Sequence, residues 1–194
     1  LGFGSPLKLG FPGEVGGRLR PAKSWRPIEQ ATMSYGHGMS VSLMQIANAY
    51  QVFARDGDIV PLSLSRLDTP PVHGSRVFAP QTAREVRQML EMVVQPGGTA
   101  QQANVPGYRV GGKTGTAMKL VGGRYANRYV ASFVGIAPIS DPRLIVAVMI
   151  DEPTNGKHYG GDVAAPVFAQ VTGGALRTLG VAPDAPLKPL QVAR

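Results

Sequence analysis

The sequence predicts an α+β fold with three layers, in which a mainly antiparallel sheet is flanked by helices on both faces. Two segments with apolar residues at helical spacing come first along the chain, three strand-like segments follow, and a further helical pattern comes last. The turn at 138–143 is too short for a crossover, so the strands on either side of it form an antiparallel hairpin. With 194 residues, the chain has room for one domain core.

Residues 42–57 carry the pattern of an amphipathic helix. Ser42 with Gln45 three positions later fits a capping box, and Gly57 can end the helix. Residues 59–67 then alternate between apolar and polar side chains, which predicts a strand. The helical residues expected to face the core are Leu43, Ile46, Ala47, Tyr50 and Phe53.

A second helix is predicted to begin at Pro80, because the fixed φ of proline suits the first helical position. The Pro-Gly-Gly turn at 96–98 ends it. Thr99 with Gln102 fits another capping box and predicts one more short helix. The residues of the second helix expected to face the core are Val86, Met89, Leu90 and Val93.

From Tyr108 the apolar pattern changes to the period of two that strands show. Three strands are predicted, over residues 109–118, 129–137 and 144–151. The third is apolar on both faces, so we expect it at the centre of the sheet with helices above and below.

A last helix is predicted over residues 162–179. Gly173 and Gly174 would let it press closely on the sheet. The residues expected to face the core are Ala164, Phe168, Val171, Ala175 and Leu179.

The two ends of the chain differ in composition from its middle. Glycine and proline are frequent over residues 1–39, which is typical of loops, and the chain begins at Leu1, so we expect it to be a fragment of a longer protein. Residues 183–194 are rich in proline and are predicted to form a flexible C-terminal tail after the folded part at 1–182.

Composition excludes several classes of function. The net charge is +8, but Lys and Arg form no run of four or more, so no nucleic-acid partner is expected. The absence of cysteine excludes a thiolate nucleophile and cysteine-bound metals. His37, His73 and His158 lack the local spacing of metal ligands, so we expect neither a metal nor another cofactor.

Residues from Gly107 to Thr114 match the phosphate-binding pattern G-x-x-x-x-G-K-[ST], which would indicate a nucleotide hydrolase. A P-loop needs a buried strand before its first glycine and a helix that begins at its lysine. The residues before Gly107 are polar and end in Pro106, and glycines follow Thr114. The P-loop is therefore the less favoured alternative.

The same segment can be interpreted as a strand that carries Lys113-Thr114-Gly115-Thr116. Lys113 would then point to one face and the two threonines to the other, so that a cation and two hydroxyl groups serve different ends of a site. An extended peptide with a terminal carboxylate suits such a strand, because its glycines leave the backbone open to a ligand that pairs alongside it. These glycines are Gly111, Gly112 and Gly115.

Short motifs along the chain resemble, in order, the transpeptidase domain of class B penicillin-binding proteins, and in particular their cell-division members. The motifs are LGFG at 1–4, FPGE at 11–14, SYGHG at 34–38, QIANAY at 45–50, PGGTA at 96–100, GKTGTAMK at 112–119, DEP at 151–153, YGG at 159–161 and APVF at 165–168. The resemblance reaches residue 182 or so. It implies the penicillin-binding transpeptidase fold that serine β-lactamases share.

The resemblance implies acyl transfer by a serine that attacks the D-alanyl-D-alanine end of a peptidoglycan stem peptide and crosslinks it to a neighbouring strand, with β-lactams trapping the serine. The family carries this serine in S-x-x-K and a second serine in S-x-N. The chain lacks S-x-N, its Ser5-Pro6-Leu7-Lys8 reads as a loop, and Tyr125-Ala126-Asn127 follows the K-T-G element instead of preceding it. The nucleophile and its lysine are therefore expected upstream of this chain, which alone should be inactive.

By the resemblance, Lys113 and Thr116 are catalytic: Lys113 lies beside the second motif, and the Thr116 backbone N–H donates to the oxyanion. Thr114, Gly115 and Thr116 are expected to bind the substrate around its carboxylate. Three aromatic residues fall at positions where related enzymes have aromatic groups along one wall of the site. They are Tyr129, His158 and Tyr159.

The implied partners are D-Ala-D-Ala stem peptides, β-lactams, the upstream part of the same domain and membrane proteins of the divisome. The implied place is the periplasmic side of the bacterial inner membrane, with a single-pass anchor outside residues 1–194. A catalytically silent, penicillin-binding-like scaffold module stays open as a second alternative, because K-T-G alone does not establish catalysis.

Overall fold

The computed structural model describes residues 1–154 and 156–186. Strands β3, β4 and β5 form an antiparallel sheet in chain order, and β1 pairs with β2 in a smaller one. Along the chain the elements are η1 (Ala22–Ser24), α1 (Pro27–Met33), α2 (Leu43–Ala49), α3 (Gln51–Ala54), β1 (Asp58–Ile59), β2 (Ser75–Arg76), α4 (Pro80–Met92), η2 (Gln101–Ala103), β3 (Gly111–Val121), β4 (Arg124–Ala137), β5 (Leu144–Asp151), α5 (Gly160–Val163) and α6 (Ala165–Thr178).

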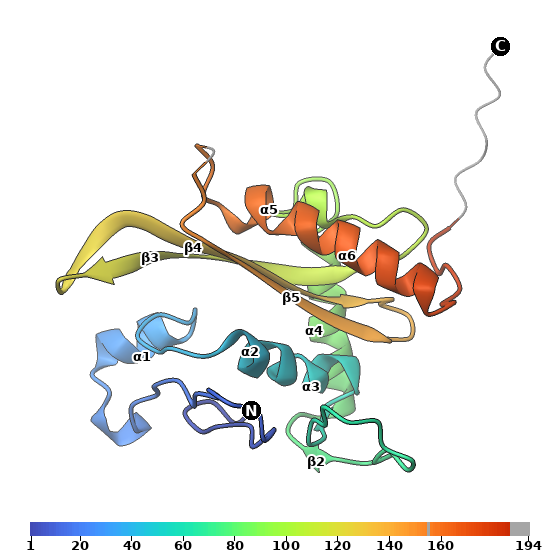
Figure 1. The fold of residues 1–194 in the computed structure, drawn as a ribbon, viewed down its shortest axis with the longest axis horizontal. Helices are drawn as coiled ribbons and strands as arrows, with labels where there is room; N and C mark the ends of the chain where they lie inside the picture. The colour runs from blue at the N-terminus through green and yellow to red at the C-terminus, as the bar shows by residue number, and fades with distance from the viewer. Residues whose placement is uncertain (155, 187–194) are drawn as a thin grey trace.

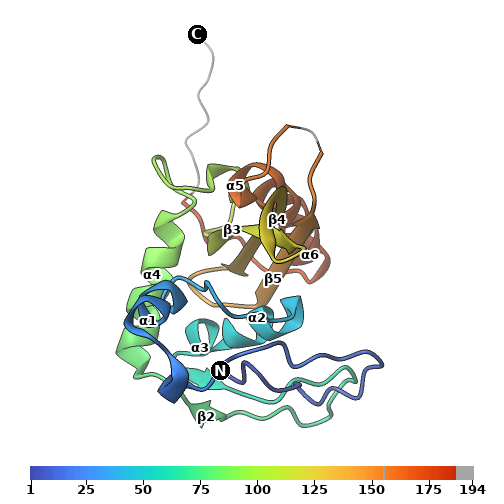
Figure 2. The same cartoon turned by 90° about the vertical axis from the view of Figure 1, so that its left-hand side faces the viewer.

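Helices cover both faces of the larger sheet. Helices α5 and α6 lie on one face, and α1, α2 and α3 lie on the other (Figure 1). Helix α4 packs beside α3 and against β3, along one side of these layers (Figure 2). The predicted α+β arrangement of three layers is confirmed.

An aromatic contact joins α6 to the middle strand. Phe133 of β4 and Phe168 of α6 are both fully buried, and their rings meet edge to face with centroids 4.8 Å apart. A Cβ atom on Gly135 would lie 2.6 Å from the Phe168 ring. The lack of a side chain at this position is therefore what lets the ring lie against the strand.

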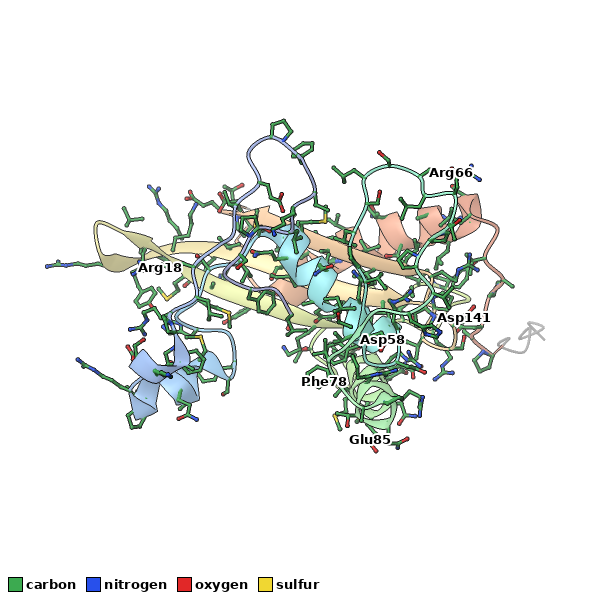
Figure 3. The ribbon with its side chains drawn as sticks, turned by 90° about the horizontal axis from the view of Figure 1, so that it is seen from below. Arg18, Asp58, Arg66, Phe78, Glu85 and Asp141 are labelled. Atoms are coloured by element: carbon green, nitrogen blue, oxygen red, sulfur yellow. The ribbon has the colours of Figure 1, made fainter. Side chains whose placement is uncertain are left out.

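The opposite face of the sheet carries a second apolar cluster. Buried Leu90 of α4 meets Ile136 of β4 and Ile139 of the following turn. Partly buried side chains surround these three, namely Tyr50, Phe53, Ala54, Val86 and Ile145. Phe53 also stacks on Phe78, which is labelled in Figure 3. Burial in this cluster raises the pKa of the Tyr50 phenol to about 12.

The predicted capping box is present, and its glutamine also has a second role. Gln45 Oε1 accepts from the Ser42 backbone N–H at 2.8 Å, and Ser42 Oγ accepts from the Gln45 N–H at 3.1 Å. The fully buried Gln45 amide also donates to the carbonyls of Ser5 and Gly16, both at 2.9 Å. This side chain anchors the glycine-rich N-terminal segment to α2.

Two strand predictions need correction. Within the described residues β4, not β5, is the central strand, because hairpins connect the strands in chain order. β5 is apolar on both faces because α6 and α2 cover both of them. The strand predicted over 59–67 is limited to β1, because Pro61 has no N–H with which to continue the ladder.

The predicted helices begin near the expected residues but differ in their buried faces. The helix over 42–57 divides at Tyr50 into α2 and α3, and the last helix divides at Ala164 into α5 and α6. Predicted core residues Met89, Val171 and Leu179 are 61%, 51% and 60% exposed. The predicted Ala164 and Phe168 are fully buried, and the other buried residues of α6 are Ala165, Thr172, Gly173 and Leu176.

The ends of the predicted regular segments also differ in places. Residues 101–103 form a 3-10 turn in which Thr99 is not the cap, and Gly173 faces Val105 instead of the sheet. Asp184, in the segment predicted as a tail, accepts hydrogen bonds from the Arg109 N–H at 2.7 Å and from Ser140 Oγ at 2.6 Å. Residues 187–194 of that segment lie outside the described residues. Among the residues described, no helix is both long and apolar enough to cross a bilayer.

Phe168 and Val171 were both predicted to face the core, but only Phe168 is buried in the structure. In the full-length protein, Phe168→Ala should reduce the free energy of unfolding by about 3–5 kcal/mol, because it removes a buried ring and leaves a cavity. The control Val171→Ala should change it by less than about 1 kcal/mol, because that side chain is half exposed. Urea unfolding checks both values, and equal losses would contradict the assigned face.

The raised pKa of Tyr50 predicts that the free energy of unfolding decreases at alkaline pH. Its phenol has a raised pKa in the folded state, so the neutral form stabilises the fold below about pH 10, and this contribution is lost as the pH rises towards about 12. The loss of urea resistance over this range should be smaller in Tyr50→Phe than in the parent protein. Tyr35→Phe, at a residue 74% exposed, should behave as the parent does.

Candidate active site

The Lys113-Thr114-Gly115-Thr116 segment lies in strand β3, opposite residues 131–134 of β4. Within the described residues β3 pairs with β4 alone, so its other edge is open to an extended ligand. A P-loop would begin a helix at Lys113, but in the structure the strand continues through Lys113 to Val121. The nucleotide-hydrolase alternative for Gly107 to Thr114 is therefore wrong.

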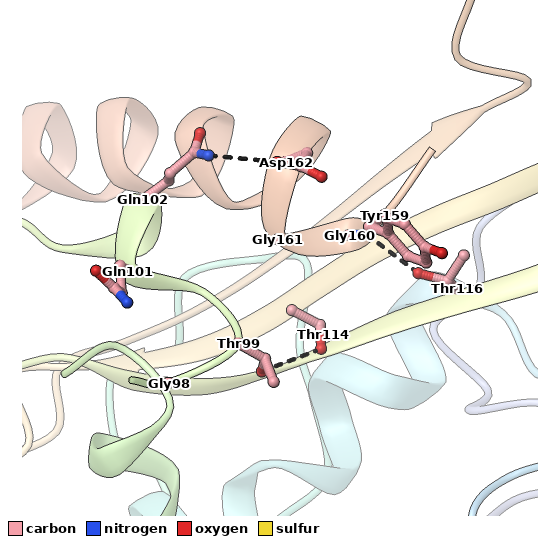
Figure 4. Close-up of a pocket in the computed structure, with 10 residues that line it drawn as sticks. All are labelled: Gly98, Thr99, Gln101, Gln102, Thr114, Thr116, Tyr159, Gly160, Gly161 and Asp162. Carbon is pink, nitrogen blue, oxygen red and sulfur yellow. Dashed lines mark hydrogen bonds between the residues drawn. The ribbon is translucent and has the colours of Figure 1, made fainter. Parts of the chain in front are cut away.

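A pocket of about 580 Å³ lies between β3, α5 and the segment around η2 (Figure 4). Most of its lining side chains are polar, and glycines bring backbone to its surface. It is lined by Gly98, Thr99, Gln101, Gln102, Thr114, Thr116, Tyr159, Gly160, Gly161 and Asp162.

The two predicted threonines present hydroxyl protons to this pocket. Thr116 Oγ1 accepts a hydrogen bond from the Gly160 backbone N–H at 3.1 Å. Thr114 Oγ1 accepts from Lys113 Nζ at 3.2 Å and lies 3.5 Å from Thr99 Oγ1. Each oxygen accepts from a nitrogen, and each hydroxyl also carries one proton that it can donate. Two such donors beside an ammonium group form a site suited to a carboxylate.

Close backbone contacts determine the position of α5 over the sheet. A Cβ atom on Gly160 would lie 2.2 Å from the Ser132 carbonyl oxygen and 2.7 Å from that of Gly115. A Cβ atom on Gly161 would lie 2.2 Å from the Thr99 carbonyl oxygen. These neighbours are backbone atoms that cannot rotate away, so the pocket depends on two consecutive glycines.

Gly115 lies on the strand between the two threonines, but it is not among the pocket-lining residues. A Cβ atom there would lie 2.5 Å from Ser132 Oγ. Side chains alternate along a strand, so this position faces away from the pocket. Gly115 can therefore contact a ligand only through its backbone.

The three predicted aromatic residues form one continuous group. The rings of Tyr129 and His158 stack with centroids 4.0 Å apart and planes at 14°. His158 and Tyr159 follow at 4.4 Å and 42°. Tyr159 lines the pocket and is 60% exposed, whereas Tyr129 and His158 stand behind it. The structure thus brings all three together at one end of the pocket.

Ion pairs beside these rings join β3 to the end of β5. Lys119 Nζ lies 3.0 Å from Asp151 and 2.8 Å from Glu152, and both carboxylates raise the pKa of the lysine. The Glu152 N–H donates to the Tyr129 carbonyl at 2.9 Å. Lys119 and the end of β5 therefore hold the backbone of the stacked tyrosine.

Sequence reasoning missed seven of the residues that line the pocket: Gly98, Thr99, Gln101, Gln102, Gly160, Gly161 and Asp162. Thr99 belongs to the PGGTA motif that carried the family resemblance, which was the available signal. Asp162 had none, because a lone acid at the start of a helix is common on protein surfaces.

The other candidate motifs lie outside the pocket lining. Ser5 and Lys8 lie in a loop, as expected. Tyr125 Oη is hydrogen-bonded to His37 Nε2 at 2.9 Å. In the described part of the chain, no group of three or more acidic or histidine side chains is placed to hold a metal ion.

Gly160 provides a test of the pocket geometry. Gly160→Ala should lower the free energy of unfolding by about 1–3 kcal/mol and displace α5, because the new methyl group collides with backbone oxygens. In the control Gly174→Ala, within α6, the added methyl group meets open space, so the variant should be about 0.5–1 kcal/mol more stable. Thermal unfolding of both variants checks this difference, and equal behaviour would contradict the tight contact.

Comparisons with known proteins show the family to which the chain belongs. A model of the penicillin binding protein transpeptidase domain matches residues 1–173. The chain is 52% identical over 188 residues to a probable peptidoglycan D,D-transpeptidase PenA of Neisseria gonorrhoeae and 44% identical over 186 residues to peptidoglycan D,D-transpeptidase FtsI of Escherichia coli. These alignments cover 96% and 95% of the chain but 32% of each relative, so the chain spans about a third of their length.

Solved structures give the same result at the level of the fold. The apo structure of the TP domain from Burkholderia pseudomallei penicillin-binding protein 3 superposes with a TM-score of 0.89 at 57% identity, over 95% of this chain and 56% of that one. The fold is thus shared with this relative across nearly the whole chain. The chain belongs to the family of penicillin binding protein transpeptidase domains.

Proposed function

We propose that the protein containing this chain is a peptidoglycan D,D-transpeptidase that crosslinks stem peptides during cell division through a serine acyl-enzyme, and that β-lactams inhibit it covalently. The main support from this chain is the pair of hydroxyl groups on Thr114 and Thr116, whose oxygens accept from Lys113 and Gly160 and whose protons are available to a carboxylate. A terminal D-alanine carboxylate and the carboxylate of a β-lactam both fit this chemistry.

In the proposed reaction, the serine Oγ forms a bond to the carbonyl carbon of the penultimate D-alanine. The peptide C–N bond breaks, and the departing D-alanine amine takes up a proton. The serine and its lysine come from the upstream part of the same domain. The Thr116 backbone N–H is one donor to the oxyanion, and the serine N–H is the other.

The remaining predicted residues have supporting roles in this proposal. Lys113 supplies positive potential beside the proton relay and orients the Thr114 hydroxyl. Gly115 offers its backbone to a substrate that pairs along the open edge of β3. The stacked rings of Tyr129, His158 and Tyr159 form an apolar wall for the substrate.

The proposal includes a place in the cell and partners. The enzyme acts at the periplasmic side of the bacterial inner membrane, with its anchor outside this chain, and works with divisome membrane proteins. The relative named FtsI supports the assignment to division.

The decisive experiment is the denatured intact mass of the full-length protein, with and without benzylpenicillin. The transpeptidase proposal expects one added drug mass on a serine upstream of this chain. A folded full-length protein that gains no mass would instead favour the catalytically silent scaffold module.

Thr116 supplies a quantitative test. Thr116→Val keeps the shape of the side chain but removes the hydroxyl, so the second-order rate of capture of a fluorescent penicillin should fall about 10–100-fold, as expected for a hydrogen bond to a charged group. Thr82→Val, at an exposed position on α4, is the matched control and should leave the rate unchanged. Capture at the parent rate by Thr116→Val would remove Thr116 from the carboxylate site.

A further inference from the structure

The pocket has two walls of opposite polarity. Thr114 and Thr116 lie along β3 with their donors and the nearby Lys113 ammonium, whereas Asp162 lies across from them on α5 (Figure 4). Asp162 is the acidic residue among those that line the pocket in the described part of the chain. A molecule that enters between these walls therefore meets a negative charge opposite the carboxylate site.

The contacts of Asp162 leave it available to a ligand. Gln102 Nε2 donates to Asp162 Oδ1 at 3.5 Å, and Lys157 Nζ lies 3.7 Å from the same oxygen. Both distances are at the long limit of such interactions, and the Asp162 side chain is 33% exposed. An incoming ammonium group can approach to the ordinary distance of about 2.8 Å and compete with both neighbours.

The chemistry of the second half-reaction suggests which ligand carries that cation, and this step rests on the proposed function. The acceptor amine bonds to the same acyl carbon that the D-alanine nitrogen has left. It must therefore enter through the space that the leaving group has vacated, beside Thr114 and Thr116. A primary amine on a side chain has a pKa near 10.4, so it reaches the enzyme as an ammonium ion.

We propose that Asp162, supported by Gln102, is a binding subsite for the acceptor amine of the crosslinking reaction. The carboxylate binds the acceptor as an ammonium ion and raises its local concentration at the pocket. The ammonium ion first releases one proton to solvent and becomes a neutral amine. The amine nitrogen then forms the C–N bond, the ester C–O bond breaks, and a second proton passes from the nitrogen to the seryl oxygen. The subsite acts on binding of the acceptor, after the donor has acylated the serine.

The test measures how the acyl-enzyme of the full-length protein divides between aminolysis and hydrolysis. A thioester donor forms the acyl-enzyme, and the acceptor is Nα-acetyl-lysinamide, whose side-chain amine is cationic near neutral pH. Asp162→Asn should raise the acceptor concentration needed for half-maximal aminolysis about five-fold, because one Coulomb contact at a partly exposed site is lost. Hydroxylamine, an uncharged acceptor near neutral pH, should show no such change.

Asp141 provides the matched control. It lies in the turn between β4 and β5, away from the pocket lining (Figure 3), so Asp141→Asn makes the same change in net charge without touching the subsite. An equal effect of Asp162→Asn on both acceptors, or an effect no larger than that of Asp141→Asn, would overturn the proposal.

Penicillin capture separates this proposal from the proposed function. Covalent capture of penicillin by Asp162→Asn shows that the variant is folded and that its serine is acylated. If the parent protein captures no penicillin, the transpeptidase assignment fails. If capture is normal and aminolysis is unchanged in the variant, the acceptor subsite alone fails.

Discussion

The contact between Phe168 and strand β4 is the constraint on which the pocket depends. The ring lies against Gly135 and Phe133, and this fixes both the position and the rotation of α6 over the sheet. Helix α5 precedes α6 with Ala164 as the only intervening residue, so it has little freedom to move independently. Its first residue, Gly160, then lies on the backbone of β3 and β4 and donates to the Thr116 hydroxyl. Packing in the core therefore determines the orientation of a hydroxyl group at the surface.

The two faces of β3 carry different groups of the site, because side chains alternate along a strand. The threonines face α5 and the pocket, while Gly115 and its neighbour Ser132 face the other side. Lys113 alternates to that other face, but its Nζ lies 3.2 Å from Thr114 Oγ1. The edge strand thus lets a cation and two hydroxyl groups act at one place, which a strand buried between two neighbours would prevent.

Much of this arrangement could be predicted from the sequence, because local signals and tertiary packing agree. The Ser42–Gln45 capping box, the start of α4 at Pro80 and the bounds of β5 follow from capping and hydrophobic period. The order of the strands could not be predicted in this way. The apolar composition of β5 shows that both of its faces are covered, but it does not show which strands lie beside it. The face of α6 was predicted in part: Phe168 is buried as expected, but the hydrophobic pattern does not show that Thr172 and Leu176 are buried while Val171 and Leu179 are exposed.

The candidate site was predictable to a different degree. Lys113, Thr114 and Thr116 follow from one short motif, and the structure brings the two threonines together on a pocket wall. Gln102 and Asp162 come from segments 60 residues apart and carry no local pattern. Their juxtaposition depends on the position of α5, which follows from that of α6 and its Phe168.

The hydroxyl arrangement has a consequence for how the pocket distinguishes the ends of peptides. Each hydroxyl of Thr114 and Thr116 has one proton to donate, and the Lys113 ammonium lies beside them. A free carboxylate can accept from both hydroxyl groups through two charged oxygens, whereas an amidated chain end offers one neutral oxygen. Hydrogen bonds to a charged acceptor are stronger, so this arrangement favours a free acid over its amide even though the two have almost the same shape.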